Sequence, residues 1–313
     1  MSRPSWSQRV AVLLLSGGLL ACQKQAAPPA QPPPLAEPDR PSGEGEGEPP
    51  PMPPQVVLAA GDIGNCASDG DEATAAMLDD LPGTLVTLGD TAYPTGSTEA
   101  FARCYAPTWG RHKARTRPVP GNHEYMEPGA APYFDYFGEA AGERGKGYYS
   151  YELGRWHVVA LNSELTGEAG LEQQRWLRED LSAHPARCTL AYMHRPLFTS
   201  MATRNNTAWV RPLWDALYEA GAEVVLAGHD HFYERFAPQT PAGVLDAERG
   251  LRQFVVGTGG TFFYALEPAP ANSRMRIGNK HGVLKLTLED KGYTWEFLQT
   301  DGNVGDQGLG VCH

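Results

Sequence analysis

The sequence VVLAAGDIG at residues 56–64 joins five apolar residues to a turn that carries an aspartate. The same arrangement recurs as LVTLGDTAY at residues 85–93 and as VVLAGHDH at residues 224–231. Near-continuous apolar runs of this length are typical of strands that are buried on both faces of a sheet. We therefore expect an α/β fold built on such strands. Further runs of the same kind lie at residues 156–161, 188–193 and 253–256.

Helical patterns lie between several of these runs. Apolar residues around Leu213 recur at intervals of three and four, with Pro212 in the first turn and Gly221 placed to end the helix. A second, less regular stripe surrounds Leu177. Both stripes are predicted to pack into the core. The first comprises Val210, Leu213, Trp214, Leu217 and Tyr218, and the second comprises Leu171, Trp176, Leu177 and Leu181.

The last part of the chain has a different pattern. Residues 282–289 and 293–299 alternate apolar and polar side chains around the sequence DKG at residues 290–292. This alternation predicts an antiparallel hairpin. Strands that alternate with helices and are followed by a hairpin indicate a layered α/β (α+β) domain with mixed sheets.

The first 22 residues have the features of an export signal. Arg3 and Arg9 precede an apolar stretch at residues 10–20, which is too short to span a bilayer as a permanent helix. The stretch leads into LLAC at residues 19–22, which resembles the lipobox of bacterial lipoproteins. The resemblance implies that Cys22 is acylated and anchors an exported protein to a membrane of the cell envelope. An ordinary signal peptide that is cut elsewhere is the alternative.

Residues 23–55 are predicted to form a solvated tether. Twelve of the 27 prolines lie between residues 28 and 54, where Gly and Glu also alternate and aromatic residues are absent. Such a composition buries too little apolar surface to offset the entropy that folding costs. Residues 56–313 then form one catalytic domain, which is long enough for a sizeable α/β core.

The chain is acidic, with a formal net charge of −11 from 37 acidic and 26 basic residues. The basic residues form no dense run, so nucleic acid is not expected as a structural partner. The composition is that of a soluble domain, and it leaves the oligomeric state open.

Four cysteines besides Cys22 form an even set, which favours disulfides if the protein is exported to an oxidising compartment. Three pairings of the four are possible. We favour Cys66 with Cys104 and Cys188 with Cys312, because each pair would pin a loop or a terminus near a predicted strand end.

Side chains of the kinds that bind metals follow four of the predicted strands above and a fifth, shorter one at residues 118–120. If these strands lie in one or two packed sheets, their carboxyl ends share an edge, which is where open α/β sheets bind ligands. Carboxylates, a phenol and an amide suit hard cations, whereas imidazoles suit zinc, iron or copper. The mixture fits two ions that share a carboxylate better than it fits one ion. The expected set is Asp62, Asp90, Tyr93, Asn122, His194, His229 and His231.

Glycine precedes four of these residues, namely Asp62, Asp90, Asn122 and His229. A glycine at such a position allows a tight turn and a close approach of the backbone. His229 and His231 are two residues apart, so a loop would let them reach two neighbouring ions.

In chain order, the motifs are DIG at 62–64, GDTAY at 89–93, GNHE at 121–124, a strand-end His194 and GHDH at 228–231. This series resembles the calcineurin-like metallophosphoesterases and, among them, the purple acid phosphatases. The resemblance covers about residues 56–265 and implies a four-layer α/β/β/α sandwich. Tyr93 indicates the purple acid phosphatases, in which the matching phenolate binds ferric iron.

The resemblance also implies how the seven residues divide between two ions. Asp62, Tyr93 and His231 would hold the first ion, which would be Fe(III). Asn122, His194 and His229 would hold the second, a divalent Zn, Mn or Fe ion, and Asp90 would bridge the pair.

Further residues are expected to act around the ions. His123 matches the family histidine that contacts phosphate and assists the leaving group, and Glu124 would orient a ligand or a water. The family often has more histidines after the one that matches His194. This chain instead has Arg195 and Arg204, which are candidates for binding the substrate phosphate or for pairing with an acid.

The expected activity is hydrolysis of small phosphate monoesters, as in acid phosphatases. A metal-bound hydroxide, held beside Asp90, would attack phosphorus while His123 gives a proton to the leaving oxygen. A phosphodiesterase would use the same metals on nucleotide or phospholipid-type diesters. A surface lipoprotein that binds metal or phosphate without turnover is a third possibility, although it would have no need of His123.

Overall fold

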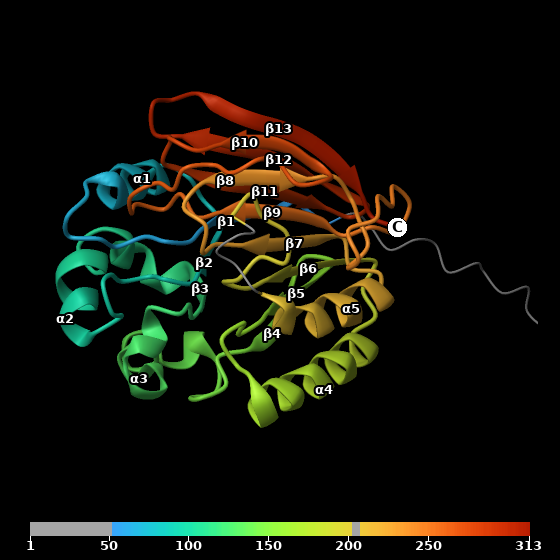
Figure 1. Cartoon of the computed structure of the whole chain (residues 1–313), viewed down its shortest axis with the longest axis horizontal. Helices are drawn as coiled ribbons and strands as arrows, with labels where there is room; N and C mark the ends of the chain where they lie inside the picture. Colours follow the sequence, from blue (N-terminus) through green and yellow to red (C-terminus); the bar gives the residue numbers. More distant parts are fainter. Residues whose placement is uncertain (1–51, 202–206) are drawn as a thin grey trace, which may run out of the picture. The chain divides into compact units, whose positions relative to one another are not determined.

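The computed structural model of the chain describes residues 52–201 and 207–313. Within these residues, thirteen strands form two mixed sheets (Figure 1). The six-stranded sheet has the order β13-β12-β11-β1-β2-β3, and the seven-stranded sheet has the order β10-β8-β9-β7-β6-β5-β4. The strands of the first are β1 (Gln55–Ala60), β2 (Thr84–Leu88), β3 (Thr116–Val119), β11 (Gly282–Glu289), β12 (Gly292–Gln299) and β13 (Val304–Val311). Those of the second are β4 (Tyr149–Leu153), β5 (Trp156–Ala160), β6 (Cys188–Tyr192), β7 (Val224–Ala227), β8 (Tyr233–Phe236), β9 (Arg252–Val256) and β10 (Ser273–Ile277).

The seven-stranded sheet is buried on both faces. Leu190 and Tyr192 of β6 belong to the core between the sheets, whereas Ala191 packs into a cluster with residues of α4 and α5. These two helices, α4 (Gly167–Ala183) and α5 (Arg211–Glu219), lie side by side along β4 to β7 (Figure 1). The predicted apolar runs are nearly continuous because alternate side chains face a sheet and a helix layer.

Side chains of the seven-stranded sheet reach backbone carbonyls of the other sheet. Tyr192 Oη donates to the Arg117 carbonyl over 3.2 Å, and Trp156 Nε1 donates to the Glu289 carbonyl over 2.8 Å. The six-stranded sheet has its own helix, α1 (Gly70–Asp79), which connects the parallel strands β1 and β2. The layers therefore follow the predicted order of helix, sheet, sheet and helix.

The stripe predicted around Leu213 is confirmed. α5 buries Leu213, Trp214 and Leu217 and ends before Gly221, whose φ of +76° lies in the region that glycine tolerates.

The stripe predicted around Leu177 is partly wrong. Leu177 is buried, but Leu171 is 54% exposed. An α-helix turns by about 100° per residue, so a side chain next to the buried Gly170 points away from the sheet. The buried face of α4 instead includes Gln173, whose amide hydrogen-bonds the backbone of Asn162.

The predicted hairpin is confirmed, since β11 and β12 pair antiparallel with Glu289 opposite Gly292. Four strands have no counterpart among the predicted runs. β4, β10 and β13 lie at sheet edges and bury few side chains, so their sequences carry little apolar signal. β8 contains Arg235, which pairs with Asp306 of β13 at 2.6 Å.

Both predicted disulfides are present. Cys188 at the start of β6 bonds Cys312 after β13, so this bridge joins the two sheets. Cys66, in the loop after β1, bonds Cys104 in the short η1 helix (Phe101–Tyr105).

The remaining elements are short and lie mainly between β2 and β4. They are α2 (Thr98–Ala100), η2 (Trp109–Arg115), η3 (Glu124–Met126), η4 (Pro128–Ala130), α3 (Ala131–Phe137), η5 (Gly138–Ala141) and, after β6, η6 (Ala208–Val210). Across the described residues, every helix is too short or too polar to cross a membrane.

Part of the predicted organisation falls outside the described residues. The predicted signal peptide, Cys22 and most of the tether lie in residues 1–51, and Arg204 lies in the gap at 202–206. β1 begins at Gln55, one residue inside the predicted tether.

Candidate metal centre

Five strand ends deliver the predicted ligand residues to one place. β1, β2 and β3 are parallel neighbours in one sheet, and β6 and β7 are parallel neighbours in the other. Their carboxyl ends therefore meet at one edge of the two-sheet core. The residues that follow these ends are Asp62, Asp90 with Tyr93, Asn122, His194, and His229 with His231.

The backbone turns sharply where it presents three of these residues. Asp62, Asp90 and His229 have positive φ values of 60°, 47° and 72°. Non-glycine residues rarely adopt this left-handed conformation, which costs free energy and is concentrated at functional sites. Three residues of the predicted set thus share a conformation that the surrounding structure must hold in place.

Glycines allow the chain to pack closely around these turns. A Cβ atom added to Gly121 would overlap Asp90 Oδ1, and one added to Gly228 would lie 2.8 Å from Asp62 Oδ2. The expected close approach of the backbone is therefore present before both Asn122 and His229.

The first group of side chains surrounds the phenol of Tyr93. Tyr93 Oη lies 2.9 Å from Asp62 Oδ1 and 3.1 Å from His231 Nε2, and the latter atom is 3.3 Å from Asp62 Oδ1. His231 Nδ1 donates to the Phe262 carbonyl over 2.7 Å, so its Nε2 lone pair faces the two oxygens.

The second group surrounds His194. His194 Nε2 lies 3.2 Å from Asn122 Oδ1 and 3.1 Å from His229 Nδ1. His194 Nδ1 donates to the Leu88 carbonyl over 2.7 Å, which again leaves Nε2 directed at the other polar atoms. An amide oxygen and two imidazole nitrogens thus converge.

Asp90 lies between the two groups. Its Oδ2 atom is 3.2 Å from Tyr93 Oη and 3.2 Å from His194 Nε2. The structure therefore brings all seven residues together, in two groups with the same members as the two sets that the family resemblance implies. Their role as metal ligands stays a prediction.

The protonation of the centre reflects its burial and its charges. Burial acts to lower the pKa of His194, but the charge of Asp90 raises this pKa to about 10. Burial, together with His194 and Arg195, lowers the pKa of His229 well below its ordinary value. Burial, together with Asp62 and Asp90, raises the pKa of the Tyr93 phenol. A cation at these atoms would replace protons on His194 and Tyr93, while His229 already offers a lone pair.

Glu124 holds the Asp90 loop, in the supporting position predicted for it. Its Oε2 accepts from the backbone N–H groups of Asp90 and Gly121 over 2.9 and 2.7 Å, and its Oε1 accepts from Thr91 over 2.8 Å. Burial and the charge of Asp90 raise the pKa of Glu124 to about 7. The side chain thus acts on the ligands through the backbone that carries them.

His123 lies at the exposed side of the centre. Its Nε2 is 3.8 Å from Asp90 Oδ2, and its side chain is 23% exposed. Its Nδ1 contacts the Pro94 carbonyl, and its ring lies 4.4 Å from the Tyr93 ring. Its Nε2 is therefore the ring nitrogen that faces Asp90, the residue between the two groups.

Arg195 reaches into the centre and is also paired with an acid, as one of its two predicted roles requires. Its other predicted role, binding the substrate phosphate, stays a prediction. Its Nε lies 2.8 Å from Glu164 Oε1, while its Nη1 and Nη2 lie 3.0 Å from His229 Nε2 and Asn122 Oδ1. The guanidinium also lies over the ring of Trp209, at 5.3 Å from its centroid. The position predicted for Arg204 lies outside the described residues.

Glu164 is a site residue that the sequence analysis missed. It follows the apolar run at 156–161, so the signal that identified the other residues was present there. Ser163 comes from the same turn, and its Oγ accepts from the backbone N–H of Arg195 over 3.0 Å. Together they fix the arginine beside the second group.

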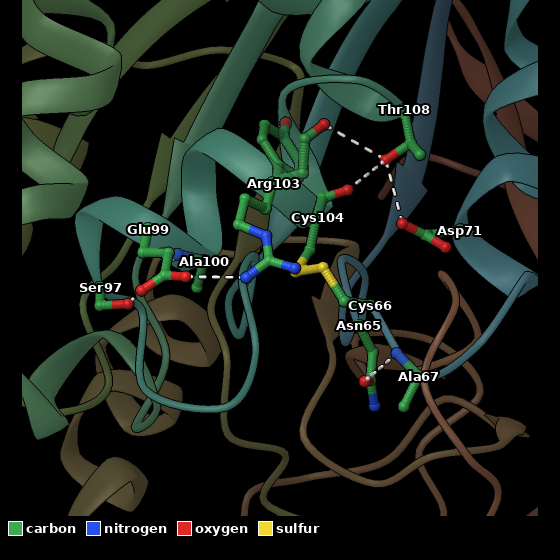
Figure 2. The surroundings of a disulfide bond; sticks show 11 residues. Asn65, Cys66, Ala67, Asp71, Ser97, Glu99, Ala100, Arg103, Cys104 and Thr108 are labelled. Atoms are coloured by element: carbon green, nitrogen blue, oxygen red, sulfur yellow. Dashed lines mark hydrogen bonds and ion pairs between the residues drawn. A yellow bond between two sulfur atoms is a disulfide. The ribbon is translucent and has the colours of Figure 1, made fainter.

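The Cys66–Cys104 disulfide lies near Tyr93 of the first group. Figure 2 shows how it joins the loop after Asp62 to η1, next to Arg103 and Glu99, which form an ion pair at 2.8 Å. The same residues line a hollow of about 580 Å³ that also borders Tyr93. The bridge thus ties the chain just after Asp62 to the segment that follows Tyr93.

Known proteins share parts of this sequence and fold. Purple acid phosphatase 23 of Arabidopsis thaliana is 28% identical over 221 residues, which cover 58% of this chain and 48% of that protein. A purple acid phosphatase from yellow lupin (Lupinus luteus) seeds superposes with a TM-score of 0.67 at 19% identity, over 82% of this chain and 53% of that chain. A dimetal phosphatase from Danio rerio superposes with a TM-score of 0.58 at 14% identity, over 84% of this chain and 100% of that chain.

The chain therefore spans about half the length of the purple acid phosphatases quoted above. A family model matches more than half of this chain. It is that of the calcineurin-like phosphoesterases, and it matches residues 56–233, which contain every residue of the predicted metal centre. The chain belongs to the calcineurin-like phosphoesterase family.

Proposed function

We propose that the protein hydrolyses phosphate monoesters with two metal ions, in the manner of an acid phosphatase. The observation that carries this proposal is the position of Asp90, whose Oδ2 lies 3.2 Å from both Tyr93 Oη and His194 Nε2. One carboxylate oxygen thus faces a donor of each group, which is a suitable position for a ligand shared by two ions. Sequence similarity to purple acid phosphatases supports the same reaction class.

The donors of the two groups suit different ions. The first group combines a carboxylate, an imidazole and a phenol whose pKa burial raises, so only a strong Lewis acid would ionise it. Fe(III) meets that need and prefers oxygen donors, which is why we place it with Asp62, Tyr93 and His231. The amide and two imidazoles of Asn122, His194 and His229 suit divalent Zn, Mn or Fe.

The protein residues then have distinct tasks. Bound metals of this kind polarise phosphoryl oxygens and lower the pKa of a water, so that it can attack phosphorus. As the bond between phosphorus and the leaving oxygen breaks, protonated His123 would give its Nε2 proton to that oxygen. Arg195 would offer its remaining N–H groups to the phosphate, while Glu164 keeps the guanidinium in place.

The substrate class is tested with two esters that share a leaving group. Protein lacking residues 1–22 should hydrolyse p-nitrophenyl phosphate faster than bis(p-nitrophenyl) phosphate, because a diester needs room for a second ester arm. A higher kcat/KM on the diester would favour a phosphodiesterase and reject the monoester assignment. Absence of turnover on both esters in metal-replete protein would favour a binding protein.

Catalysis is tested separately from metal binding with His123→Ala. This variant should keep the metal content of the parent, and its kcat should fall roughly 10²- to 10⁴-fold, as expected for loss of a general acid. His313→Ala serves as the control, because His313 contacts Glu223 rather than the centre. A His123→Ala variant with unchanged kcat would refute the role of this histidine.

We also propose that the protein is exported and held to a cell-envelope membrane by acylated Cys22. The two disulfides support export, because such bonds persist mainly in oxidising compartments. The proline-rich residues 23–54 would let the catalytic domain stand away from the membrane.

A further inference from the structure

A second cluster of metal-ligand side chains lies outside the candidate metal centre. It comprises Glu152 of β4, His157 of β5, and Asp180 and His184 at the end of α4. One ligand atom from each of His157, Asp180 and His184 lies within 4.8 Å of the others. The proposed phosphate chemistry uses none of these residues.

The cluster lies far from the candidate centre. That centre lies at the carboxyl ends of the parallel strands, whereas His157 is the second residue of β5. α4 has 17 residues and is therefore about 25 Å long. It starts three residues after Glu164, which contacts Arg195, and it ends at the cluster. The two sites therefore occupy opposite ends of the strands.

Asp180 is the middle of the cluster. Its Oδ2 lies 2.8 Å from His157 Nε2, and its Oδ1 lies 3.2 Å from His184 Nδ1. The two imidazole rings stack with centroids 5.0 Å apart and an angle of 13° between their planes. Asp180 and His184 are four residues apart, a spacing that puts side chains on the same face of a helix. Two imidazoles thus turn a nitrogen toward one carboxylate. His184 Nδ1 also donates to the Asp180 carbonyl over 2.9 Å, so a cation at this nitrogen would replace its proton.

Glu152 orients His157. Its Oε1 accepts from His157 Nδ1 over 2.7 Å. His157 Nε2 is in turn hydrogen-bonded to Asp180 Oδ2 at 2.8 Å, so a cation bound between these two atoms would take the place of the proton that they share. Metal-ligating histidines usually donate their other ring N–H to a carboxylate in this way.

The surroundings favour a cation and allow it to enter. The side chains of His157 and Asp180 are 1% and 6% exposed, whereas that of His184 is 50% exposed and lines a hollow of about 400 Å³. The last turn of α4 has no Lys or Arg, although the partial negative charge at a helix C-terminus favours cations. An ion can therefore reach the buried pair from the side of His184.

We propose that His157, Asp180 and His184 bind one Zn²⁺ ion, with Glu152 as the outer partner of His157. Two imidazoles and a carboxylate are common zinc donors, and a water would complete the four ligands. The ion would clamp β5 to the end of α4. An ion without affinity for the unfolded chain also stabilises the folded one.

The test compares zinc binding by variants of the protein with its catalytic metals in place. Zinc is titrated against a competing chromophoric chelator, and bound metal is counted by elemental analysis. The parent should bind one more zinc per chain than His184→Ala, which lacks one of three ligands. Glu152→Gln should weaken this zinc roughly tenfold. His313→Ala, which removes a histidine beside a carboxylate elsewhere, should bind zinc like the parent.

Two further measurements, of the unfolding temperature and of phosphatase activity, complete the test. Zinc should raise the unfolding temperature of the parent and of His313→Ala but not that of His184→Ala. Hydrolysis of p-nitrophenyl phosphate by His184→Ala should stay at the level of the parent, which shows that the variant is folded and that its catalytic centre is intact. Equal zinc content in the parent and His184→Ala would overturn the proposal and leave these residues as an ion-paired cluster only.

Discussion

Burial and charge together set the protonation of single residues in the centre. Tyr93 is the clearest case, because burial and the carboxylates of Asp62 and Asp90 all raise the pKa of its phenol. The same surroundings hold its oxygen 2.9 Å from Asp62 and 3.1 Å from His231. A phenol in these surroundings holds its proton tightly when no metal ion is bound. Its oxygen is nevertheless well placed to bind a metal ion that is a strong Lewis acid.

Replacement of Tyr93 by Phe should abolish the visible charge-transfer absorption that we expect for the oxidised protein, because the phenolate is its source. The ring should still pack, since only the hydroxyl is removed. Absorption spectra of parent and variant at equal iron content test this expectation. A variant that keeps the visible band would show that another group binds the iron, and a parent without iron would remove the ferric assignment.

The site residues were predictable wherever a polar motif follows an apolar strand. That signal identified Asp62, Asp90 and His194, because the end of a buried strand both exposes a side chain and fixes its position. The same signal was present at Glu164. This residue was missed because it belongs to none of the five motifs that resemble the family. The pairing of Arg195 with Glu164 depends on tertiary contact between the ends of β5 and β6, which sequence spacing does not encode.

At the scale of elements, buried strands were predictable and edge strands were not. β5, β6 and β7 are buried on both faces, so their apolar runs are continuous. β13 has neighbours on one side only and alternates glycine with exposed Leu309 and Val311, which matches no simple apolar pattern. The buried face of α4 was predicted only in part, because it includes Gln173 and Asp180, which make hydrogen bonds instead of apolar contacts.

The start of β7 carries a buried carboxylate that should make stability depend on pH. Burial raises the pKa of Glu223 from 4.5 to about 7. The unfolded chain loses this proton near pH 4.5, whereas the folded chain holds it to near pH 7. Folding stability from this group is therefore present at low pH and falls as pH rises between these values, by at most about 3 kcal/mol.

Glu223→Gln cannot ionise, so its stability should not decline over this window. The difference in free energy of unfolding between Glu223→Gln and the parent should therefore change with pH. At pH 8 it should favour the variant by about 1–3 kcal/mol more than at pH 5. Denaturant unfolding of both proteins at the two pH values measures the difference. Parallel pH profiles would show that Glu223 does not titrate as its burial implies.

At the scale of the whole molecule, the layered core was predictable because motifs and strand patterns agreed over residues 56–233. The Cys188–Cys312 pairing was also predicted, and it closes a sequence separation of 124 residues between the two sheets. Sequence patterns determine less about the residues outside this core. The proposed export and anchoring rest on the amino-acid sequence of residues 1–51.

Cys22→Ser should release the protein from the membrane, because the acylated cysteine is the anchor that we propose. The parent should appear in the membrane fraction of a bacterial expression host and should incorporate labelled palmitate, since two or more acyl chains anchor stably. The variant should do neither. Both proteins appearing in the same soluble fraction would contradict the lipoprotein assignment, although the catalytic domain would be unaffected.

We propose that seven side chains from five strand ends hold a pair of metal ions. Anomalous X-ray diffraction from crystals of the metal-replete protein, measured on both sides of the iron absorption edge, tests it most directly. We predict two peaks bridged by Asp90, with iron beside Tyr93 and the second ion beside His194. A single peak, or peaks that leave Asp62 and Asn122 without an ion, would contradict this account of the centre.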